Sequence, residues 1–355
     1  MPWPTKDWPT AEMALPPEAR RLVDLAFDPS SNVGQSQALL IVQGGRLIYR
    51  RYAGSIEYFD RPPDPVTSST RLLAWSLAKS VLHAVVGILV DDGRLEVDAP
   101  VLAPEWRSED DPRRAITLAH LLEMRDGLDF VEEYEDFETS DVIQMLFGSG
   151  KDDVAAFAAD RPLAAPPGER YYYSSGTSNV ISGLVARTVG HGDPYLELLE
   201  ERIFGPLGMA STDPGLDGVG TWVASSLLHA TAEDYARFGL LYLRGGLWED
   251  SPLLPSGWVD HGRRPRSVDP EEGHVHGAHW WAEPDGFGTF RAAGYEGQMI
   301  LLVPDLDVVV VRLGKTPPSL KEELVRWRRA LVPALAPLAA PGGSGPTDGR
   351  GQPPS

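Results

Sequence analysis

The sequence predicts an α+β fold in which strands from both ends of the chain form one antiparallel sheet, with a helical region inserted between them. Apolar and β-branched runs, typical of strands, lie near the start of the chain and again near its end, at residues 37–42, 46–52, 289–293, 298–303 and 308–313. The intervening residues 130–240 favour helices and loops. Strands on both sides of a helical stretch therefore predict a sheet assembled from both ends of the chain, with helices flanking it.

The first elements are a hairpin and a buried helix. Gly44-Gly45 separates the two early strands, and such a pair favours the tight turn of a β-hairpin. From residue 77 to residue 92 the apolar spacing predicts a buried helix, closed by Gly93.

Further helices and a final hairpin follow. Thr117 is a suitable N-cap for a short helix over residues 117–124, which ends near Gly127. Pro304-Asp305 forms the turn between the last two strands. The clearest later helices are expected at residues 180–189, 195–202, 232–244 and 319–338.

We expect three regions along the chain: an N-terminal extension with a helix at residues 1–35, one domain at residues 36–340, and a disordered tail at residues 341–355. The tail contains five Gly and four Pro and lacks an apolar anchor. No internal repeat divides the domain.

Composition excludes several classes of function. With 51 acidic and 32 basic residues, the net charge of −19 disfavours nucleic-acid and anionic-membrane partners. The absence of Cys excludes a disulfide scaffold, a thiolate nucleophile and a Cys-held metal. No run of about 18 apolar residues is present, and the first residues lack the pattern of a secretory signal. We therefore expect a cytoplasmic protein.

Lysine is scarce, and one lysine stands out. The five are Lys6, Lys79, Lys151, Lys315 and Lys321. Only Lys79 follows a serine by three residues, in Trp75-Ser-Leu-Ala-Lys79, where the most hydrophobic helix begins. That spacing places the Ser76 hydroxyl and the ammonium on one helical face. Burial would make the lysine a base able to activate the serine, whereas the alternative is an exposed pair with chance spacing.

Two further segments are candidates for the same site. In Tyr171-Tyr-Tyr-Ser-Ser175, a phenol beside the ammonium would have a lowered pKa and carry a proton, although packing of the tyrosines is the alternative. In Gly294-Tyr-Glu-Gly-Gln298, the glycines leave a strand edge open to a substrate, or form only a bulge. An N–H of this strand, together with the Ser76 N–H, would form an oxyanion hole.

In chain order these motifs resemble those of the serine β-lactamase and penicillin-binding-protein superfamily. The class C-like branch, with carboxylesterases and 6-aminohexanoate-dimer hydrolases, is the most similar. The resemblance implies a β-lactamase/transpeptidase-like fold, with an antiparallel sheet, flanking helices and an inserted helical subdomain. It implies Ser76 as nucleophile, Lys79 as base and Tyr173 as the catalytic tyrosine. The backbone N–H groups of Ser76 and Gln298 would form the oxyanion hole.

Two departures from the family pattern bear on the substrate. Tyr295 stands where β-lactamases carry Lys and many esterase-like relatives carry His, which removes an anchor for a substrate carboxylate. Ser175 stands where many relatives have Asn. Gly297 lies in the same strand motif, and Tyr134 in the acidic loop 129–138 resembles a lid residue of the nylon-oligomer hydrolases, although a solvated loop is the alternative. Neutral or small ester and amide substrates therefore fit best.

The function predicted is a cofactor-independent serine hydrolase that cleaves small esters or amides through an acyl-enzyme on Ser76. The alternatives are an acyltransferase of the same fold, a true β-lactamase or D,D-peptidase, and a catalytically silent binding protein. A metal is not expected, because His274, His276 and His279 lack nearby carboxylates in ligand register. The oligomeric state stays open.

Overall fold

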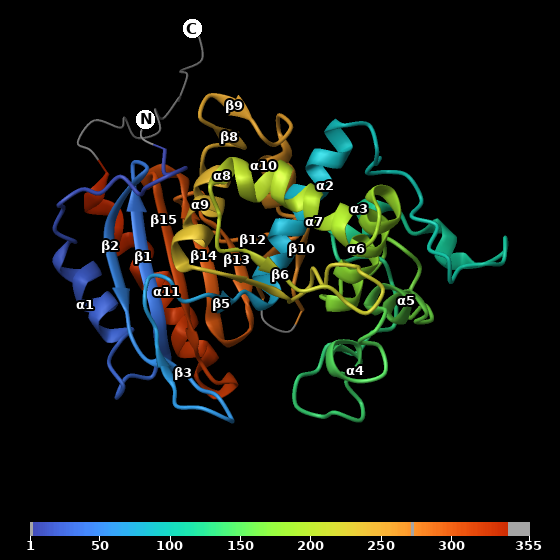
Figure 1. The fold of residues 1–355 in the computed structure, drawn as a ribbon, viewed down its shortest axis with the longest axis horizontal. Helices are drawn as coiled ribbons and strands as arrows, with labels where there is room; N and C mark the ends of the chain where they lie inside the picture. The colour runs from blue at the N-terminus through green and yellow to red at the C-terminus, as the bar shows by residue number, and fades with distance from the viewer. Residues whose placement is uncertain (1–2, 271–272, 340–355) are drawn as a thin grey trace, which may run out of the picture.

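The computed structural model describes residues 3–270 and 273–339, and its central feature is an eight-stranded sheet (Figure 1). The strands lie in the order β10-β11-β12-β13-β14-β15-β1-β2, and every neighbouring pair is antiparallel. Their bounds are Gln35–Gln43 (β1), Arg46–Tyr52 (β2), Ser267–Val268 (β10), Val275–His276 (β11), Trp281–Ala282 (β12), Phe290–Gly294 (β13), Gln298–Val303 (β14) and Val308–Lys315 (β15). The prediction of one antiparallel sheet built from both ends of the chain is confirmed.

The two ends of the chain meet at β1, which lies between β2 and β15. Leu40 of β1 pairs with Val311 of β15. Leu40 and Val42 face one hydrophobic core, and Leu39 and Ile41 face the other. Because β1 is buried on both faces, its sequence is a nearly continuous apolar run, which made the strand predictable.

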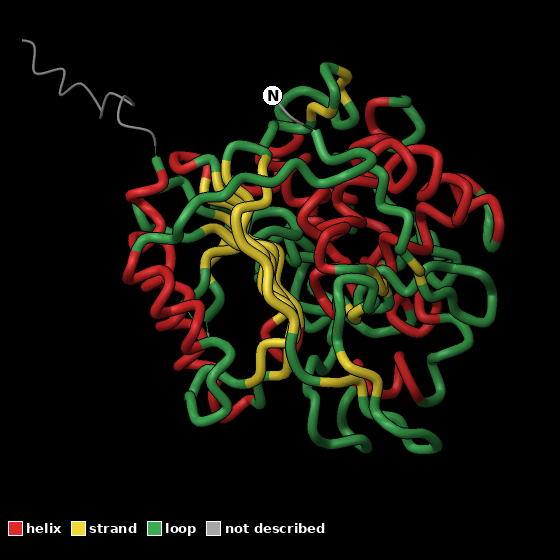
Figure 2. The backbone as a smooth tube through the Cα atoms, turned by 60° about the vertical axis from the view of Figure 1, so that its left-hand side comes forward, coloured by secondary structure: helices red, strands yellow, loops and turns green. Residues whose placement is uncertain are grey.

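Two helices cover one face of the sheet, α1 (Pro17–Leu25) and α11 (Lys321–Leu335). Figure 2 shows them on one side of the thin strand layer, with the larger helical region on the other side. The Trp327 indole N–H donates to the Leu22 carbonyl over 2.8 Å. The N-terminal helix therefore shares a core with the closing helix, and α11 is the amphipathic helix predicted at the end of the chain.

The opposite face is covered by α2 (Ala78–Asp91), which follows a 3₁₀ turn at Trp75–Leu77, and by α9 (Ala232–Leu243). Both helices lie where the sequence predicted them. A methyl group at Gly239 of α9 would stand 2.7 Å from the Ile300 side chain and 2.8 Å from that of Val309. Glycine therefore lets α9 approach β14 and β15 closely, and α2 carries the candidate nucleophile segment between the sheet and the helical region.

The remaining elements are short. The other helices are α3 (Leu118–Leu122), α4 (Asp141–Phe147), α5 (Val154–Ala159), α6 (Ser175–Val189), α7 (Asp193–Leu199), α8 (Gly205–Leu207) and α10 (Trp258–Arg263). The other strands are β3 (Ser55–Ile56), β4 (Asp64–Pro65), β5 (Leu72–Leu73), β6 (Asp213–Pro214), β7 (Leu228–Ala230), β8 (Leu247–Trp248) and β9 (Ser251–Pro252). In Figure 1 the helices α3 to α7 gather on one side of the sheet as the inserted helical region.

Several predicted helices differ in their bounds. The helix expected at residues 195–202 is α7 (Asp193–Leu199), followed by a π-helical turn at Glu200–Phe204. Helix α3 begins after its predicted cap, Thr117, but ends at Leu122, because Met124 takes a left-handed conformation with φ of +57°. Helix α6 begins five residues earlier than predicted, at Ser175, because the Ser174 side chain accepts the Thr177 N–H as an N-cap.

Other predictions concern the ends of the chain. Among the described residues, no helix has the length and apolar character needed to cross a membrane. The tail predicted at residues 341–355 lies outside the described residues. The boundaries at residues 35 and 340 remain predictions.

Candidate active site

Ser76 and Lys79 lie where the 3₁₀ turn passes into α2. The Lys79 ammonium donates to the Ser76 hydroxyl over 2.8 Å, so the structure brings together the two side chains whose spacing singled them out. Trp75, directly before Ser76, has a left-handed φ of +49°. Backbone strain of this kind, of order 1–3 kcal/mol for a residue with a side chain, is typical of functional sites.

Lys79 is buried and fully hydrogen-bonded. Its side chain donates also to the Ser175 hydroxyl at 3.0 Å and to the Ser225 carbonyl at 2.9 Å. The three N–H groups of an ammonium therefore each have an acceptor. Burial lowers the pKa of Lys79 to about 8, and the negative charge of Glu132 opposes this shift. A lysine with this pKa supplies a neutral amine near physiological pH, as a general base requires.

Tyr173 lies beside the pair, in the segment that leads into α6. The Lys79 ammonium stands 5.1 Å from the centre of its ring, and the Trp281 ring lies 5.3 Å away on another side. Burial raises the pKa of Tyr173, although a hydrogen bond with Ser76 opposes the rise. The expectation of a lowered pKa is therefore wrong, because burial outweighs the hydrogen bond with Ser76 and the positive charge of Arg291. Tyr173 is a neutral phenol at rest, suited to relay a proton.

Ser175 joins Lys79 to a carboxylate that the sequence did not single out. Glu132 accepts the Ser175 hydroxyl at 2.6 Å and the Ser175 backbone N–H at 2.7 Å. The Tyr134 hydroxyl donates to the same carboxylate over 2.5 Å. A continuous chain of hydrogen bonds thus runs from Glu132 through Ser175 and Lys79 to Ser76. The acidic loop 129–138 was the only sequence signal for it. Nothing in the sequence distinguished Glu132 from the other three glutamates and the two aspartates of this loop.

Asn179 positions Ser225, whose carbonyl is the third acceptor of Lys79. The sequence did not identify Asn179 as a site residue. Asn179 is fully buried on α6. Its amide donates to the Ser225 hydroxyl over 3.1 Å and accepts the Ser225 N–H over 3.2 Å. These two bonds fix the Ser225 backbone, whose carbonyl oxygen accepts from Lys79.

A cavity of about 510 Å³ lies over Ser76, and aromatic rings form part of its wall. The Tyr134 ring stacks on that of Tyr295 with centres 5.2 Å apart, and Trp75 meets Tyr295 edge-on at 5.8 Å. Ser76, Tyr173 and Gly297 also line the cavity. Tyr134 therefore lines the same cavity as Ser76, and its role as a lid residue remains a prediction.

The turn between β13 and β14 brings the glycine motif beside the nucleophile. A side chain at Gly294 would overlap the Ala74 carbonyl, and one at Gly297 would overlap the Arg312 guanidinium. The two glycines thus admit close packing of the protein itself, and both also line the cavity. The approach of a substrate at this strand edge remains a prediction. The Gln298 N–H donates to the Tyr295 carbonyl across the turn. Its role as an oxyanion donor remains a prediction, and it requires this bond to open towards the substrate.

The three histidines of the candidate metal motif contact an aromatic ring, a hydroxyl and a backbone carbonyl. The His279 ring bonds the Ser178 hydroxyl at 2.9 Å and the Leu122 carbonyl at 2.9 Å. The His276 ring packs edge-on against Trp281 at 4.9 Å. Among the described residues, no three His, Cys, Asp or Glu side chains converge in a way that would hold a metal ion.

The arrangement is suited to acyl transfer. A hydroxyl lies within hydrogen-bond distance of a buried amine whose pKa is about 8, and a neutral phenol lies beside both. These are the parts of an activated nucleophile, a general base and a proton relay.

Comparisons with known proteins agree with the fold. The chain matches the beta-lactamase family over residues 32–335. It is 27% identical over 307 residues to the 6-aminohexanoate-dimer hydrolase of Paenarthrobacter ureafaciens, an alignment that covers 79% of this chain and 73% of that protein.

Solved structures share the fold. A candidate 6-aminohexanoate-dimer hydrolase from Bacillus anthracis superposes with a TM-score of 0.74 at 21% identity, covering 92% of this chain and 88% of the other. EstCE1, described as a hydrolase with promiscuous acyltransferase activity, gives a TM-score of 0.70 at 17% identity, covering 90% of this chain and 98% of the other.

Proposed function

The chain belongs to the beta-lactamase family, and from this premise we propose that it is a serine hydrolase that cleaves small esters or amides through an acyl-enzyme on Ser76. The observation that carries the proposal is the buried Lys79 amine, 2.8 Å from the Ser76 hydroxyl at the base of a cavity. Its relatives include an amide hydrolase, the 6-aminohexanoate-dimer hydrolase, and its fold is shared by a family VIII carboxylesterase.

The first half-reaction forms the acyl-enzyme. The Ser76 oxygen attacks the substrate carbonyl carbon while its proton passes to the neutral amine of Lys79. The carbonyl π electrons move to oxygen, and the resulting oxyanion accepts from the backbone N–H groups of Ser76 and Gln298. Collapse of the intermediate breaks the bond to the leaving group, which takes a proton from Lys79 through the Tyr173 phenol. The second half-reaction repeats these steps with water as the nucleophile, which frees Ser76 and releases the acid.

The substrate proposed is neutral near Tyr295. Burial raises the pKa of the Tyr295 hydroxyl, and the negative charges of Glu296 and Glu135 raise it further, so a substrate carboxylate beside this ring would meet like charges. Arg291, Lys321 and Arg328 line other parts of the cavity wall. Short-chain neutral esters and linear amides fit this surface better than penicillins do. No cofactor enters any step of the proposed reaction.

Covalent labelling tests the proposal. A fluorophosphonate probe followed by peptide mass mapping should modify Ser76, and the Ser76→Ala variant should remain unlabelled. Equal labelling of the two proteins, or a label on another residue alone, would falsify the assignment.

A substrate panel tests the specificity. We expect turnover of short-chain p-nitrophenyl esters and little or none of nitrocefin, and the reverse order would contradict the role given to Tyr295. Product analysis with and without an added alcohol distinguishes hydrolysis from acyl transfer, the main alternative. A transferred acyl group as the dominant product would make the protein an acyltransferase with the same acyl-enzyme.

A further inference from the structure

Arg312, on β15, is a fully buried arginine whose acceptors in the described part of the chain are all neutral oxygens. Burying a cation without a carboxylate partner is unfavourable, so such a residue calls for a reason. Burial lowers the pKa of Arg312 to about 10, which still leaves the group charged at neutral pH. Arg312 also lines the cavity that contains Ser76.

The guanidinium is saturated by the protein itself. Nη1 donates to the Glu296 carbonyl at 2.9 Å and to the Gly297 carbonyl at 3.0 Å. The other acceptors are the Thr316 hydroxyl at 2.8 Å, the Gln35 carbonyl at 3.2 Å and the Ser36 hydroxyl at 3.2 Å. A guanidinium has five N–H donors, and these bonds use them all. Arg312 therefore has no donor left to anchor a substrate carboxylate.

The turn is shaped to receive this arginine. Glu296 and Gly297 both take left-handed conformations, with φ of +58° and +82°. Gly297 also has no side chain at the point where a Cβ would overlap Arg312 Nη1. Any other residue at position 297 would be strained and would push the guanidinium away. Gly297, in the glycine motif that the sequence singled out, therefore packs directly against Arg312.

We infer that Arg312 is a positioning residue for the turn from Tyr295 to Gln298, and that it sets the orientation of the peptide bond that supplies the second oxyanion donor. A peptide bond is planar and trans, so its C=O and N–H point in opposite directions. By fixing the Gly297 carbonyl, the guanidinium directs the Gln298 N–H away from itself. Its charge also polarises this amide, which strengthens the N–H as a donor. The catalytic part of this inference rests on the proposed function.

The test compares Arg312→Lys and Arg312→Met with the wild type. Lysine keeps the charge but has only three donors, and methionine removes both charge and donors. Arg237→Lys is the matched control, because Arg237 is buried too but bonds Asp234 and the N-terminal segment, away from the cavity. We expect both Arg312 variants to label Ser76 with fluorophosphonate about 10-fold to 100-fold more slowly. Their kcat for a neutral p-nitrophenyl ester should fall while KM changes less than about twofold. The control should label at nearly the wild-type rate.

A second measurement needs no catalysis. Amide hydrogen exchange of the peptide covering residues 294–299 should be faster in both Arg312 variants and unchanged in Arg237→Lys. If wild-type Ser76 is not labelled, the proposed function fails, whereas the exchange result still decides whether Arg312 holds the turn.

Two results would overturn the inference. One is that Arg312→Met labels Ser76 at the wild-type rate and shows the wild-type rate of amide exchange in the peptide 294–299. The other is a loss confined to esters that carry a carboxylate, which would make Arg312 a substrate anchor. Should both Arg312 variants fail to fold, Thr316→Val removes one acceptor of the guanidinium and should raise the exchange of the same peptide, with a smaller slowing of labelling, about twofold to fivefold. Unchanged exchange and labelling in that variant contradict the inference as well.

Discussion

At the residue scale, burial assigns the acid–base roles of Lys79 and Tyr173. It disfavours the charged form of each group, so it lowers the pKa of Lys79 and raises that of Tyr173. The neutral amine thereby becomes accessible near pH 8, whereas a phenolate does not form. Lys79 is thus the group able to take the Ser76 proton. Tyr173 stays protonated, so it can only relay a proton that another group supplies.

The pH dependence of acylation follows from this assignment. The active form has a neutral Lys79, which makes up roughly a tenth of the enzyme at pH 7 for a pKa of about 8. The rate of Ser76 labelling should therefore rise with pH and level off above a midpoint near 8. Stopped-time labelling between pH 6 and pH 10, pH values chosen to span that midpoint, checks the profile. A flat profile, or one falling through pH 8, would show that Lys79 is not the base.

Gly294 provides a second test at this scale. In Gly294→Ala the new methyl group overlaps the Ala74 carbonyl, so either β13 or the segment before Ser76 must shift. We expect labelling to slow at least about tenfold, with a loss of stability of about 1–3 kcal/mol. Gly239→Ala is the control, because its methyl group meets only core side chains of β14 and β15. It should lose stability but keep its labelling rate while folded, and equal slowing in both variants would mean that the effect is not local.

At the element scale, the loop that carries Glu132 and Tyr134 connects the cavity wall to Lys79. Tyr134 stacks on Tyr295 and donates to Glu132, and Glu132 accepts from Ser175. Because Ser175 in turn accepts from Lys79, the position of the loop is linked to the hydrogen bonds of the base.

Replacing the carboxylate tests this link. Glu132→Gln keeps the shape of the side chain but removes the charge, which raises the pKa of Lys79 in the wild type. We expect the midpoint of the rise of kcat/KM with pH to move below 8, because the neutral amine of Lys79 then forms at lower pH. Glu133→Gln is the matched control, because the Glu133 carboxylate accepts from the backbone N–H groups of Glu135 and Asp136 in its own loop. An unchanged midpoint in Glu132→Gln would show that Glu132 does not influence the pKa of Lys79.

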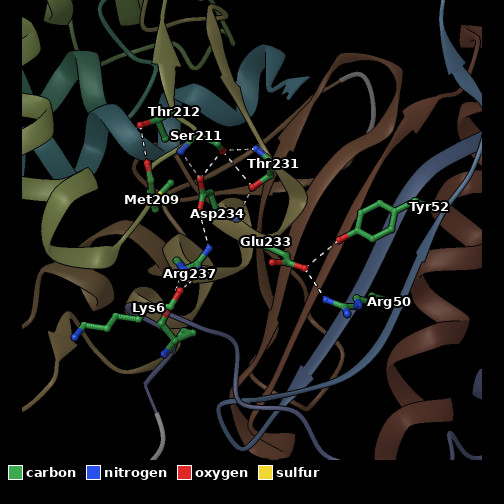
Figure 3. Close-up of polar contacts among 11 residues, drawn as sticks. Lys6, Arg50, Tyr52, Met209, Ser211, Thr212, Thr231, Glu233, Asp234 and Arg237 are labelled. Atoms are coloured by element: carbon green, nitrogen blue, oxygen red, sulfur yellow. Dashed lines mark hydrogen bonds and ion pairs between the residues drawn. The ribbon is translucent and has the colours of Figure 1, made fainter. Parts of the chain in front are cut away.

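At the scale of the whole molecule, α9 fastens the N-terminal segment to the domain (Figure 3). Arg237 donates to Asp234 at 2.6 Å and to the Pro4 carbonyl at 2.8 Å, and both charged side chains are buried. One turn away, Glu233 pairs with Arg50 of β2, whose side chain is half exposed. Arg237, paired with Asp234 of the same helix, thus joins α9 to the N-terminal segment through the Pro4 carbonyl. Glu233 joins α9 to β2 through a much more exposed ion pair.

The two ion pairs should therefore contribute differently to the free energy of unfolding. Arg237→Met leaves the Asp234 carboxylate buried without its cation and should lower the free energy of unfolding by about 3–5 kcal/mol. Arg50→Met loses a largely solvated pair and should lower it by less than about 1 kcal/mol. Denaturant melts of the two variants check the comparison. Equal losses would show that the N-terminal segment is not held by the Arg237 contact.

How far the site could be predicted depends on the distance along the chain between its parts. Ser76 and Lys79 are three residues apart on one helix, so helical periodicity alone placed them together. Tyr173, Ser175 and Gln298 were assigned through the order of motifs. Glu132 and Arg312 had no such signal, since a carboxylate in an acidic loop and an arginine in a strand are common in any sequence.

The sequence by itself determined the central strands, the helices α2, α9 and α11, and the serine–lysine pair, because each depends on a short repeating pattern of apolar or paired residues. Only the tertiary structure decided which distant groups complete the site. Ser225 and Ser175 reach Lys79 from 146 and 96 residues away, and Arg312 reaches Gly297 from the next strand. Only folding decided the pKa values of Lys79 and Tyr173 as well, because desolvation depends on what surrounds a side chain and not on its neighbours in the sequence.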